Sequence, residues 1–220
     1  DGKYAFYAHN DSHPTTDFRI PYIEETDSLD ENSTEYDWII NSLEKVSEKL
    51  LWLKDEGVPV LWRPLHESNG IWFWWGCGDK NGNNRGKALI CLWRFMVNFF
   101  NKKGLTNLIW VWNGQDKEMY PGDEWVDIVG EDIYATTKDK IDITSQKSRF
   151  DFAKEVSSGK KIIALSENGS IPDIDEMKKD GAMWAWFMTW NDMKVDENKR
   201  PVGDRFEDYN FFAGEYFNPK

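Results

Sequence analysis

The chain has 220 residues, which suits one domain with a sizeable core. Its 27 Lys and Arg residues stand against 39 Asp and Glu residues, so the net charge is −12. A field of this sign repels phosphate backbones and anionic lipid, and we therefore expect no nucleic acid and no membrane among its partners. Aromatic residues make up 15% of the chain, and so many rings must be buried or used in binding. Rings on an acidic surface suit uncharged ligands with apolar faces, above all sugars.

Residues 1–34 are polar and irregular and predict a long loop. Apolar residues at helical spacing then predict a helix from about Tyr36 to Asp55, with Ser33 or Thr34 as its N-cap. Over the rest of the chain, short apolar runs alternate with further helical segments. These patterns predict strands at 58–66, 107–113, 126–134, 161–167 and 182–190, and helices at 86–102, 144–157 and 174–179.

Apolar strands that alternate with helices indicate a parallel α/β sheet, either open or closed into a barrel. Five strands fall short of the eight that a closed barrel needs. An open sheet of the nucleotide-binding type usually has a glycine-rich phosphate loop after a strand, and the sequence shows none. No internal repeat is visible, and we expect residues 1–220 to form a single domain whose sheet strands begin at about residue 58.

Function in parallel α/β folds gathers at the carboxyl ends of the strands. Two predicted strands end in a glutamate, Glu67 and Glu167, although the apolar runs before them need no carboxylate for packing. Glycoside hydrolysis requires such a pair, one protonated and one ionised. The alternative is that each is a solvated carboxylate at a strand end. The other polar or aromatic strand-end residues are Arg63, His66, Asn113, Asp132, Tyr134, Asn168, Trp190, Asn191 and Asp192.

Aromatic neighbours of the two glutamates suggest a binding surface. The Tyr134 hydroxyl could donate to the carboxylate of Glu167 and orient it, and a core tyrosine is the alternative. Trp72 begins a run of four aromatic residues in a loop, of which at least one is expected to form a sugar platform. Trp190, at the end of the last strand, could form the floor of the site or a core ring.

The sequence favours neither metal nor serine chemistry. His66 and Glu67 lack the second histidine of the HExxH zinc motif, because position 70 is glycine. His9 and His13 lie in the polar loop and are expected at the surface. Ser166 is not in a G-x-S-x-G elbow. We expect no metal and no cofactor.

Processing signals are few. The first residues lack the basic and apolar stretches of a signal peptide. Cys77 and Cys91 make no disulfide framework, and a bridge between them is left open. Asn168 lies in an N-x-S sequon beside Glu167, where a glycan would obstruct the site.

Longer motifs carry a family resemblance. The segment 63–76, RPLHESNGIWFWWG, resembles the acid/base signature of glycoside hydrolase family 26, the endo-β-mannanase family. Four further segments continue the match in the same order, and the resemblance extends from about residue 36 to about residue 192. These segments are 108–113, 120–130, 165–169 and 184–187.

The resemblance implies a (β/α)8 TIM barrel, of which this chain lacks the first three strands. It implies a retaining double displacement, with Glu67 as the acid/base on the fourth strand and Glu167 as the nucleophile on the seventh. The two carboxyl groups should then lie about 5–5.5 Å apart. The substrate-binding residues implied are His66, Trp72, Tyr134 and Trp190. One residue departs from the pattern: Glu131 stands where an apolar residue is expected, as a salt-bridged structural carboxylate or a subsite feature.

The resulting hypothesis is a secreted, endo-acting hydrolase of internal β-1,4-mannosidic bonds in mannan, glucomannan or galactomannan. Mixed-linkage β-glucan or xylan are alternative substrates for the same mechanism. A protein that binds polysaccharide without cutting it is the alternative from a different class. The strand count by itself also allows an open-sheet α/β enzyme of other chemistry.

Overall fold

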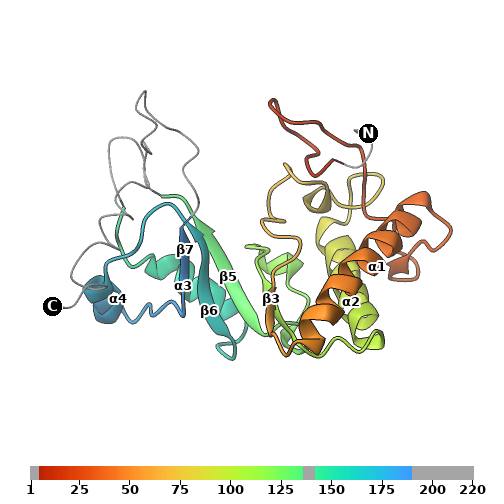
Figure 1. Ribbon diagram of the computed structural model, residues 1–220. Coiled ribbons are helices and arrows are strands. Elements are labelled where there is room, and N and C mark those ends of the chain that lie inside the picture. Colours follow the sequence, from red (N-terminus) through yellow and green to blue (C-terminus); the bar gives the residue numbers. More distant parts are fainter. Residues whose placement is uncertain (1–4, 136–141, 190–220) are drawn as a thin grey trace, which may run out of the picture. The chain divides into compact units, whose positions relative to one another are not determined.

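A computed structural model describes residues 5–135 and 142–189 (Figure 1). The chain forms two compact units, Asp1–Ile128 and Val129–Lys220. The strands are β1 (Tyr22–Ile23), β2 (Ser28–Leu29), β3 (Val60–Trp62), β4 (Leu108–Trp112), β5 (Ile128–Ile133), β6 (Ile162–Asn168) and β7 (Phe187–Thr189). The helices are α1 (Thr34–Asp55), α2 (Arg85–Lys102), α3 (Lys147–Val156) and α4 (Ile174–Asp180), with 3₁₀ turns η2 (Trp74–Gly76), η3 (Lys117–Met119) and η4 (Asp123–Trp125).

Strand order decides between the open sheet and the barrel. The five-stranded sheet has the order β3-β4-β5-β6-β7, which is the order of the sequence. A doubly wound sheet reverses its strand order at a switch point, whereas a (β/α)8 barrel adds each strand beside the previous one. The pairs β3–β4 and β6–β7 are parallel. The fold is therefore part of a (β/α)8 barrel, as expected, and the open doubly wound sheet is wrong.

Two expectations for the first unit differ from the structure. The segment 1–34 is not all loop, because β1 and β2 form a short antiparallel hairpin that pairs Tyr22 with Leu29. The strand expected at 58–66 ends at Trp62. Pro64 has no N–H to donate to a ladder, and Leu65 has a left-handed φ of +54°, so the strand cannot continue.

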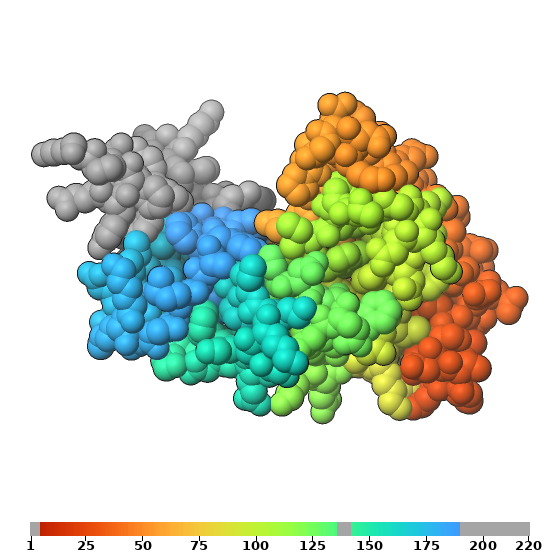
Figure 2. Space-filling view, turned by 90° about the horizontal axis from the view of Figure 1, so that it is seen from below, coloured from red at the N-terminus to blue at the C-terminus, as the bar shows by residue number. Residues whose placement is uncertain are grey.

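Helix α1 begins where a capping residue was predicted. The Ser33 hydroxyl accepts a hydrogen bond from the Tyr36 N–H, and Glu35 and Asp37 in the first turn complement the helix dipole. One face of the helix is buried and the other is exposed, and α1 forms part of the outer surface of the first unit (Figure 2). The buried residues are Ile39, Leu43, Ser47 and Leu50.

The core of the first unit is an aromatic layer between α2 and the strands β3 and β4. Phe100 on α2 is fully buried, with its ring centroid 5.8 Å from that of Trp62 and 6.0 Å from that of Trp110. Trp93 lies two turns before Phe100 on the same face of α2. It meets Trp110 edge-on at 5.6 Å, and its indole N–H donates to the Trp125 carbonyl. Much of the aromatic content thus positions the carboxyl ends of β3 and β4.

The second unit packs α3 against its strands. Phe150 on α3 meets Trp184 edge-on at 5.1 Å, and the Trp184 indole donates to the Ser145 carbonyl. Trp184 is thereby held against α3, and β7 begins later than the expected residue 182.

Glu131 on β5 is fully buried and forms an ion pair with Arg149 on α3, which is the structural role that the sequence left open. Burial raises the pKa of Glu131 from 4.5 to about 7, because removing the carboxylate from water costs more than the Arg149 guanidinium recovers.

Two smaller expectations can be checked. Cys77 and Cys91 both carry free thiols, so they are not bridged. His9 and His13 are exposed, as expected. Among the described residues, no helix has the length and apolarity needed to cross a bilayer.

We expect Phe100→Ala to lower the free energy of unfolding by about 3–5 kcal/mol, because it opens a cavity between two tryptophans. Trp52→Ala is the matched control, since Trp52 is 61% exposed on α1 and its loss should change stability by no more than about 0.5 kcal/mol. Urea unfolding of the full-length protein measures both. Equal effects of the two changes would contradict this account of the core.

Glu131→Gln should change how stability depends on pH. Because the folded pKa is raised, the stability associated with Glu131 is fully present below about pH 4.5 and is lost as the pH rises through 7. Between these limits the wild type should lose about 3 kcal/mol relative to Glu131→Gln. Urea unfolding of the full-length proteins at pH 4 and pH 8 gives this difference. A wild type that gains stability over the variant as the pH rises would show that Arg149 dominates instead.

Candidate active site

Glu67 lies in the loop that follows β3, residues 65–76, which we call the Glu67 loop. Its backbone is left-handed, with φ of +52°, a conformation that costs a non-glycine residue about 1–3 kcal/mol and is common at functional sites. The Glu67 N–H donates to the carbonyl of Asn113 at 2.8 Å, and the Arg63 guanidinium donates to the Asn113 side-chain oxygen at 2.8 Å. The ends of β3 and β4 are thereby joined, and the loop begins from a fixed point.

Arg85, the first residue of α2, holds the other side of the Glu67 loop. Its guanidinium donates to the carbonyls of Gly76 at 2.6 Å and Asn69 at 2.9 Å, with longer bonds to Ser68 and Gly70. The loop folds back on itself so closely that a Cβ atom on Gly76 would lie 2.0 Å from the Gly70 oxygen. The Arg85 guanidinium therefore binds carbonyls from both sides of the folded-back loop.

Two of the predicted binding residues accompany Glu67. The Trp72 indole N–H donates to a Glu67 carboxylate oxygen at 3.2 Å, and the ring remains 38% exposed. The His66 ring lies 4.9 Å from that of Phe73, and its carbonyl accepts a hydrogen bond from the Trp75 indole. Glu67, His66 and Trp72 thus belong to one cluster in the first unit.

Glu167 lies near the carboxyl end of β6 in the second unit and is 4% exposed. The Tyr134 hydroxyl donates to a Glu167 carboxylate oxygen at 2.6 Å, which is the contact that the sequence suggested. The Gly169 N–H donates to the Ile133 carbonyl, so the ends of β5 and β6 are held together at this point. Each glutamate therefore has one aromatic hydrogen-bond donor. Trp190 lies outside the described residues.

The family model for glycosyl hydrolase family 26 matches residues 8–209 of this chain. The chain belongs to this family. It is 36% identical to mannan endo-1,4-beta-mannosidase A of Piromyces sp over 220 residues, which is all of this chain and 31% of that protein. Mannan endo-1,4-beta-mannosidase B of Piromyces sp is also 36% identical, over 94% of this chain and 33% of its own length.

Solved mannanase structures are also similar to this chain. The beta-mannanase from a symbiotic protist of the termite Reticulitermes speratus, solved with a gluco-manno-oligosaccharide, is 33% identical, with a TM-score of 0.73 over 94% of this chain and 60% of that one. The Podospora anserina GH26-CBM35 β-(1,4)-mannanase is 31% identical, with a TM-score of 0.71 over 88% of this chain and 39% of that one. The chain spans about a third of the curated Piromyces proteins.

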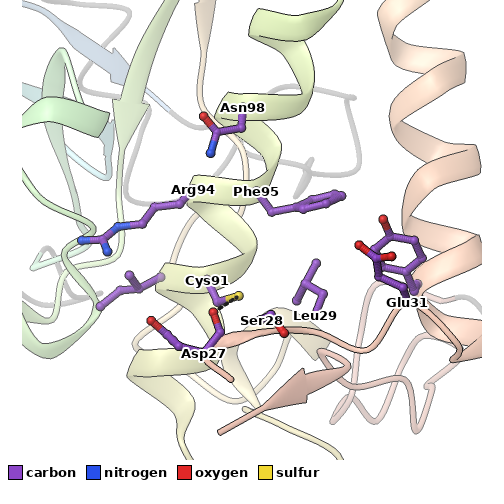
Figure 3. A pocket seen from close by; sticks show the side chains of 10 residues that line it. Asp27, Ser28, Leu29, Glu31, Cys91, Arg94, Phe95 and Asn98 are labelled. Carbon is purple, nitrogen blue, oxygen red and sulfur yellow. Dashed lines mark hydrogen bonds between the residues drawn. The ribbon is translucent and has the colours of Figure 1, made fainter. Parts of the chain in front are cut away.

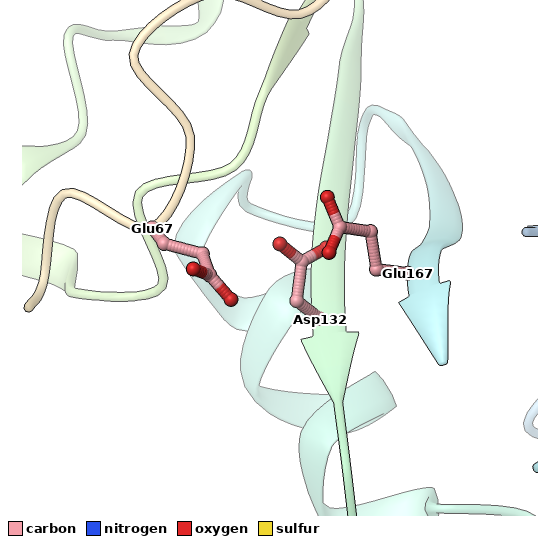
Figure 4. Close-up of side chains that lie close together, drawn as sticks. All are labelled: Glu67, Asp132 and Glu167. Carbon is pink, nitrogen blue, oxygen red and sulfur yellow. The ribbon is translucent and has the colours of Figure 1, made fainter. Parts of the chain in front are cut away.

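Asp132 lies beside Glu167, although the sequence analysis noted it only as a strand-end residue. It is on β5 and precedes Tyr134, which directly follows the strand, by two positions. The alternation of side chains predicts that the two point to the same side. One of its carboxylate oxygens lies within 4.8 Å of one of Glu167, and both side chains are labelled in Figure 4. The period of two along the strand was the available signal. Two carboxylates are far fewer oxygen ligands than the six to eight of a calcium site.

Asn168 bears on the glycan question. Its side chain is 1% exposed, and neither polar atom has a hydrogen-bond partner within the part of the chain that the structure describes. A side chain this deeply buried is not open to glycan attachment in the folded family 26 chain.

A cavity of about 330 Å³ lies in the first unit between α2 and the β1–β2 hairpin (Figure 3). None of the predicted site residues lines it. Cys91 does, and burial together with the nearby Asp27 carboxylate raises the pKa of its thiol to about 11. The thiol is therefore neutral and unsuited to nucleophilic chemistry at neutral pH.

We expect Arg85→Ala to loosen the Glu67 loop. Loss of the charged hydrogen bonds should speed amide hydrogen exchange over residues 67–77 by at least about tenfold, without global unfolding. Lys87→Ala is the matched control, because Lys87 lies on the same helix and pairs with Glu24 instead. Hydrogen exchange read by mass spectrometry on the full-length protein measures both. Equal exchange in the two variants would show that the arginine does not hold the loop.

Proposed function

We propose that the protein is a retaining, endo-acting glycoside hydrolase that cleaves internal β-1,4-mannosidic bonds by double displacement. The observation that carries the proposal is a pair of glutamates, one in the loop after β3 and one near the end of β6, each bound by an aromatic donor: Trp72 on Glu67 and Tyr134 on Glu167. The names of the relatives support it, because seven curated matches are mannan endo-1,4-beta-mannosidases.

In the first step, the Glu67 carboxylic acid protonates the glycosidic oxygen while the Glu167 carboxylate attacks the anomeric carbon. The bond to the leaving sugar breaks, and a glycosyl ester forms on Glu167. In the second step, the Glu67 carboxylate removes a proton from water, whose oxygen attacks the same carbon and releases Glu167. Two inversions give net retention, and the enzyme returns to its starting protonation state.

The neighbouring residues have distinct tasks in this proposal. The Tyr134 hydroxyl keeps one Glu167 oxygen bound, so the other is presented to the anomeric carbon. Asp132, two positions before Tyr134, holds carboxylate oxygens close to Glu167. Trp72 positions Glu67 through its indole N–H and offers a ring face to a sugar. His66 and Trp190 are proposed to contact the substrate.

Mannan, glucomannan or galactomannan is the proposed substrate, and the enzyme is proposed to be secreted, because such polymers meet their hydrolases outside the cell. Mixed-linkage β-glucan is the second candidate. A match to endoglucanase H of Acetivibrio thermocellus favours it, at 34% identity over 37% of this chain. The proposal involves no metal and no cofactor.

We expect Glu67→Gln and Glu167→Gln each to lower the rate of mannan hydrolysis at least about 10²-fold, since each removes a group that moves a proton or forms a bond. Glu48→Gln, at an exposed position of α1, is the control and should retain full activity. Reducing-sugar release by the full-length protein is the measurement, and proton NMR of the first product should show the retained anomer.

Three other results would change the proposal. Full activity in either active-site variant would contradict the roles given to the glutamates. A wild type that binds mannan without releasing reducing sugar would favour the non-catalytic binding protein. Faster initial rates on mixed-linkage β-glucan or xylan than on mannan would change the substrate and keep the mechanism.

A further inference from the structure

The N-terminal segment 5–16 is paired with the Glu67 loop. Tyr7 and Phe73 form an antiparallel bridge, and the hydrogen bonds on either side run from the Ala8 N–H to the Trp72 carbonyl at 2.7 Å and from the Trp74 N–H to the Phe6 carbonyl at 3.1 Å. In Figure 1 the two segments lie side by side in the first unit. Because the Trp72 indole donates a hydrogen bond to Glu67, the N-terminal segment adjoins the candidate active site.

A column of four rings fixes the pairing. His13 stacks on Tyr7 with centroids 5.0 Å apart, Tyr7 on Phe73 at 5.3 Å, and Phe73 on Trp75 at 4.4 Å, with interplanar angles of 13°, 24° and 16°. The last ring is buried and donates its indole N–H to the His66 carbonyl. The N-terminal segment is therefore held by stacked rings as well as by its backbone.

Two aromatic side chains on one face of this paired backbone are open to water. Phe6 is 71% exposed and Trp72 is 38% exposed. The Tyr7–Phe73 bridge places Phe6 opposite Trp74, two positions from Trp72, so alternation along the backbone predicts that Phe6 and Trp72 share a face. Phe6 meets the buried Trp75 edge-on at 6.3 Å, so its position is defined although its ring is open to solvent. Isolated apolar residues are common on surfaces, but an anchored group beside a reactive carboxylate marks a binding surface.

We propose that Phe6 extends the Trp72 sugar contact into a further subsite, which we call the Phe6 platform. It takes a hexose unit of a β-1,4-linked chain beyond the sugars that flank the cleaved bond. This inference rests on the proposed function. Such a hexose is uncharged and has an apolar face that can cover the Phe6 ring, whereas the net charge of −12 disfavours an anionic polymer.

A subsite at this distance from the bond changes substrate affinity according to chain length. A long oligosaccharide covers the Phe6 platform and gains apolar contact, and a short one ends before reaching it. The platform touches no reacting atom, so its loss should raise KM for long substrates and leave kcat unchanged.

The experiment compares Phe6→Ala with wild type in the full-length protein on mannohexaose and on mannotriose. We expect KM for mannohexaose to rise about tenfold, as for the loss of one buried aromatic contact, with kcat and both constants for mannotriose unchanged. Phe6→Trp keeps an aromatic ring at this position and should leave KM for mannohexaose at the wild-type value. Trp52→Ala removes another exposed ring, on α1, and should leave KM for both substrates unchanged. An equal effect of Phe6→Ala on both lengths, or no difference from Trp52→Ala, would overturn the platform.

A second measurement separates this inference from the proposed function. If the wild type fails to hydrolyse mannan, the proposed function fails, and the platform is then tested by electrophoresis through gels containing mannan, mixed-linkage β-glucan or xylan. Retardation of the wild type that Phe6→Ala loses and Trp52→Ala keeps supports the platform without catalysis. Equal mobility of wild type and Phe6→Ala in all three gels overturns it.

Discussion

The end of strand β4 is the point on which the Glu67 loop depends. Asn113 is fully buried, and it accepts one hydrogen bond from the Arg63 guanidinium and another from the Glu67 N–H. A buried donor that loses its acceptor costs about 1–3 kcal/mol, so these bonds outweigh many looser surface contacts. They hold Glu67 in a left-handed backbone conformation that a free loop would abandon, and Arg85 secures the rest of the loop. The carboxylate proposed as the acid/base is thus placed by backbone geometry that begins in the sheet.

Aromatic residues have two roles in this chain, and their solvent exposure distinguishes the two groups. Phe100 and Trp93 are buried between α2 and the strands, where they set the distance from the helix to the sheet. Trp72 and Phe6 keep open ring faces beside Glu67. Trp75 supports the exposed set, because it is buried itself and carries a stacked column that reaches the surface at His13. The aromatic residues therefore contribute both to the core and to the proposed sugar surface.

Strand β5 shows how one short segment serves both packing and chemistry. Side chains alternate along a strand, so Glu131 and Asp132 lie on opposite faces of β5. Glu131 meets Arg149 of α3, and its raised pKa reflects the cost of burying a carboxylate even with a cation beside it. Tyr134, in register with Asp132, carries the hydroxyl that binds Glu167. A charge that is costly for stability thus lies next to the residues that orient the proposed nucleophile.

The sequence by itself determined the approximate places of the four helices and of the five strands of the parallel sheet in the described chain, an N-cap at Ser33 or Thr34, and the two glutamates that lie at or after strand ends. These features depend on periodicity and neighbouring residue types, which are local. It also indicated the Tyr134–Glu167 contact, since adjacent parallel strands bring their carboxyl ends to one edge. Only the tertiary structure decided that Arg85 holds the Glu67 loop, that Arg149 meets Glu131, and that the backbone at Phe6 pairs with the Glu67 loop. Each of these contacts joins residues at least 9 positions apart, and such partners are chosen by the packing of whole segments, which local patterns do not encode.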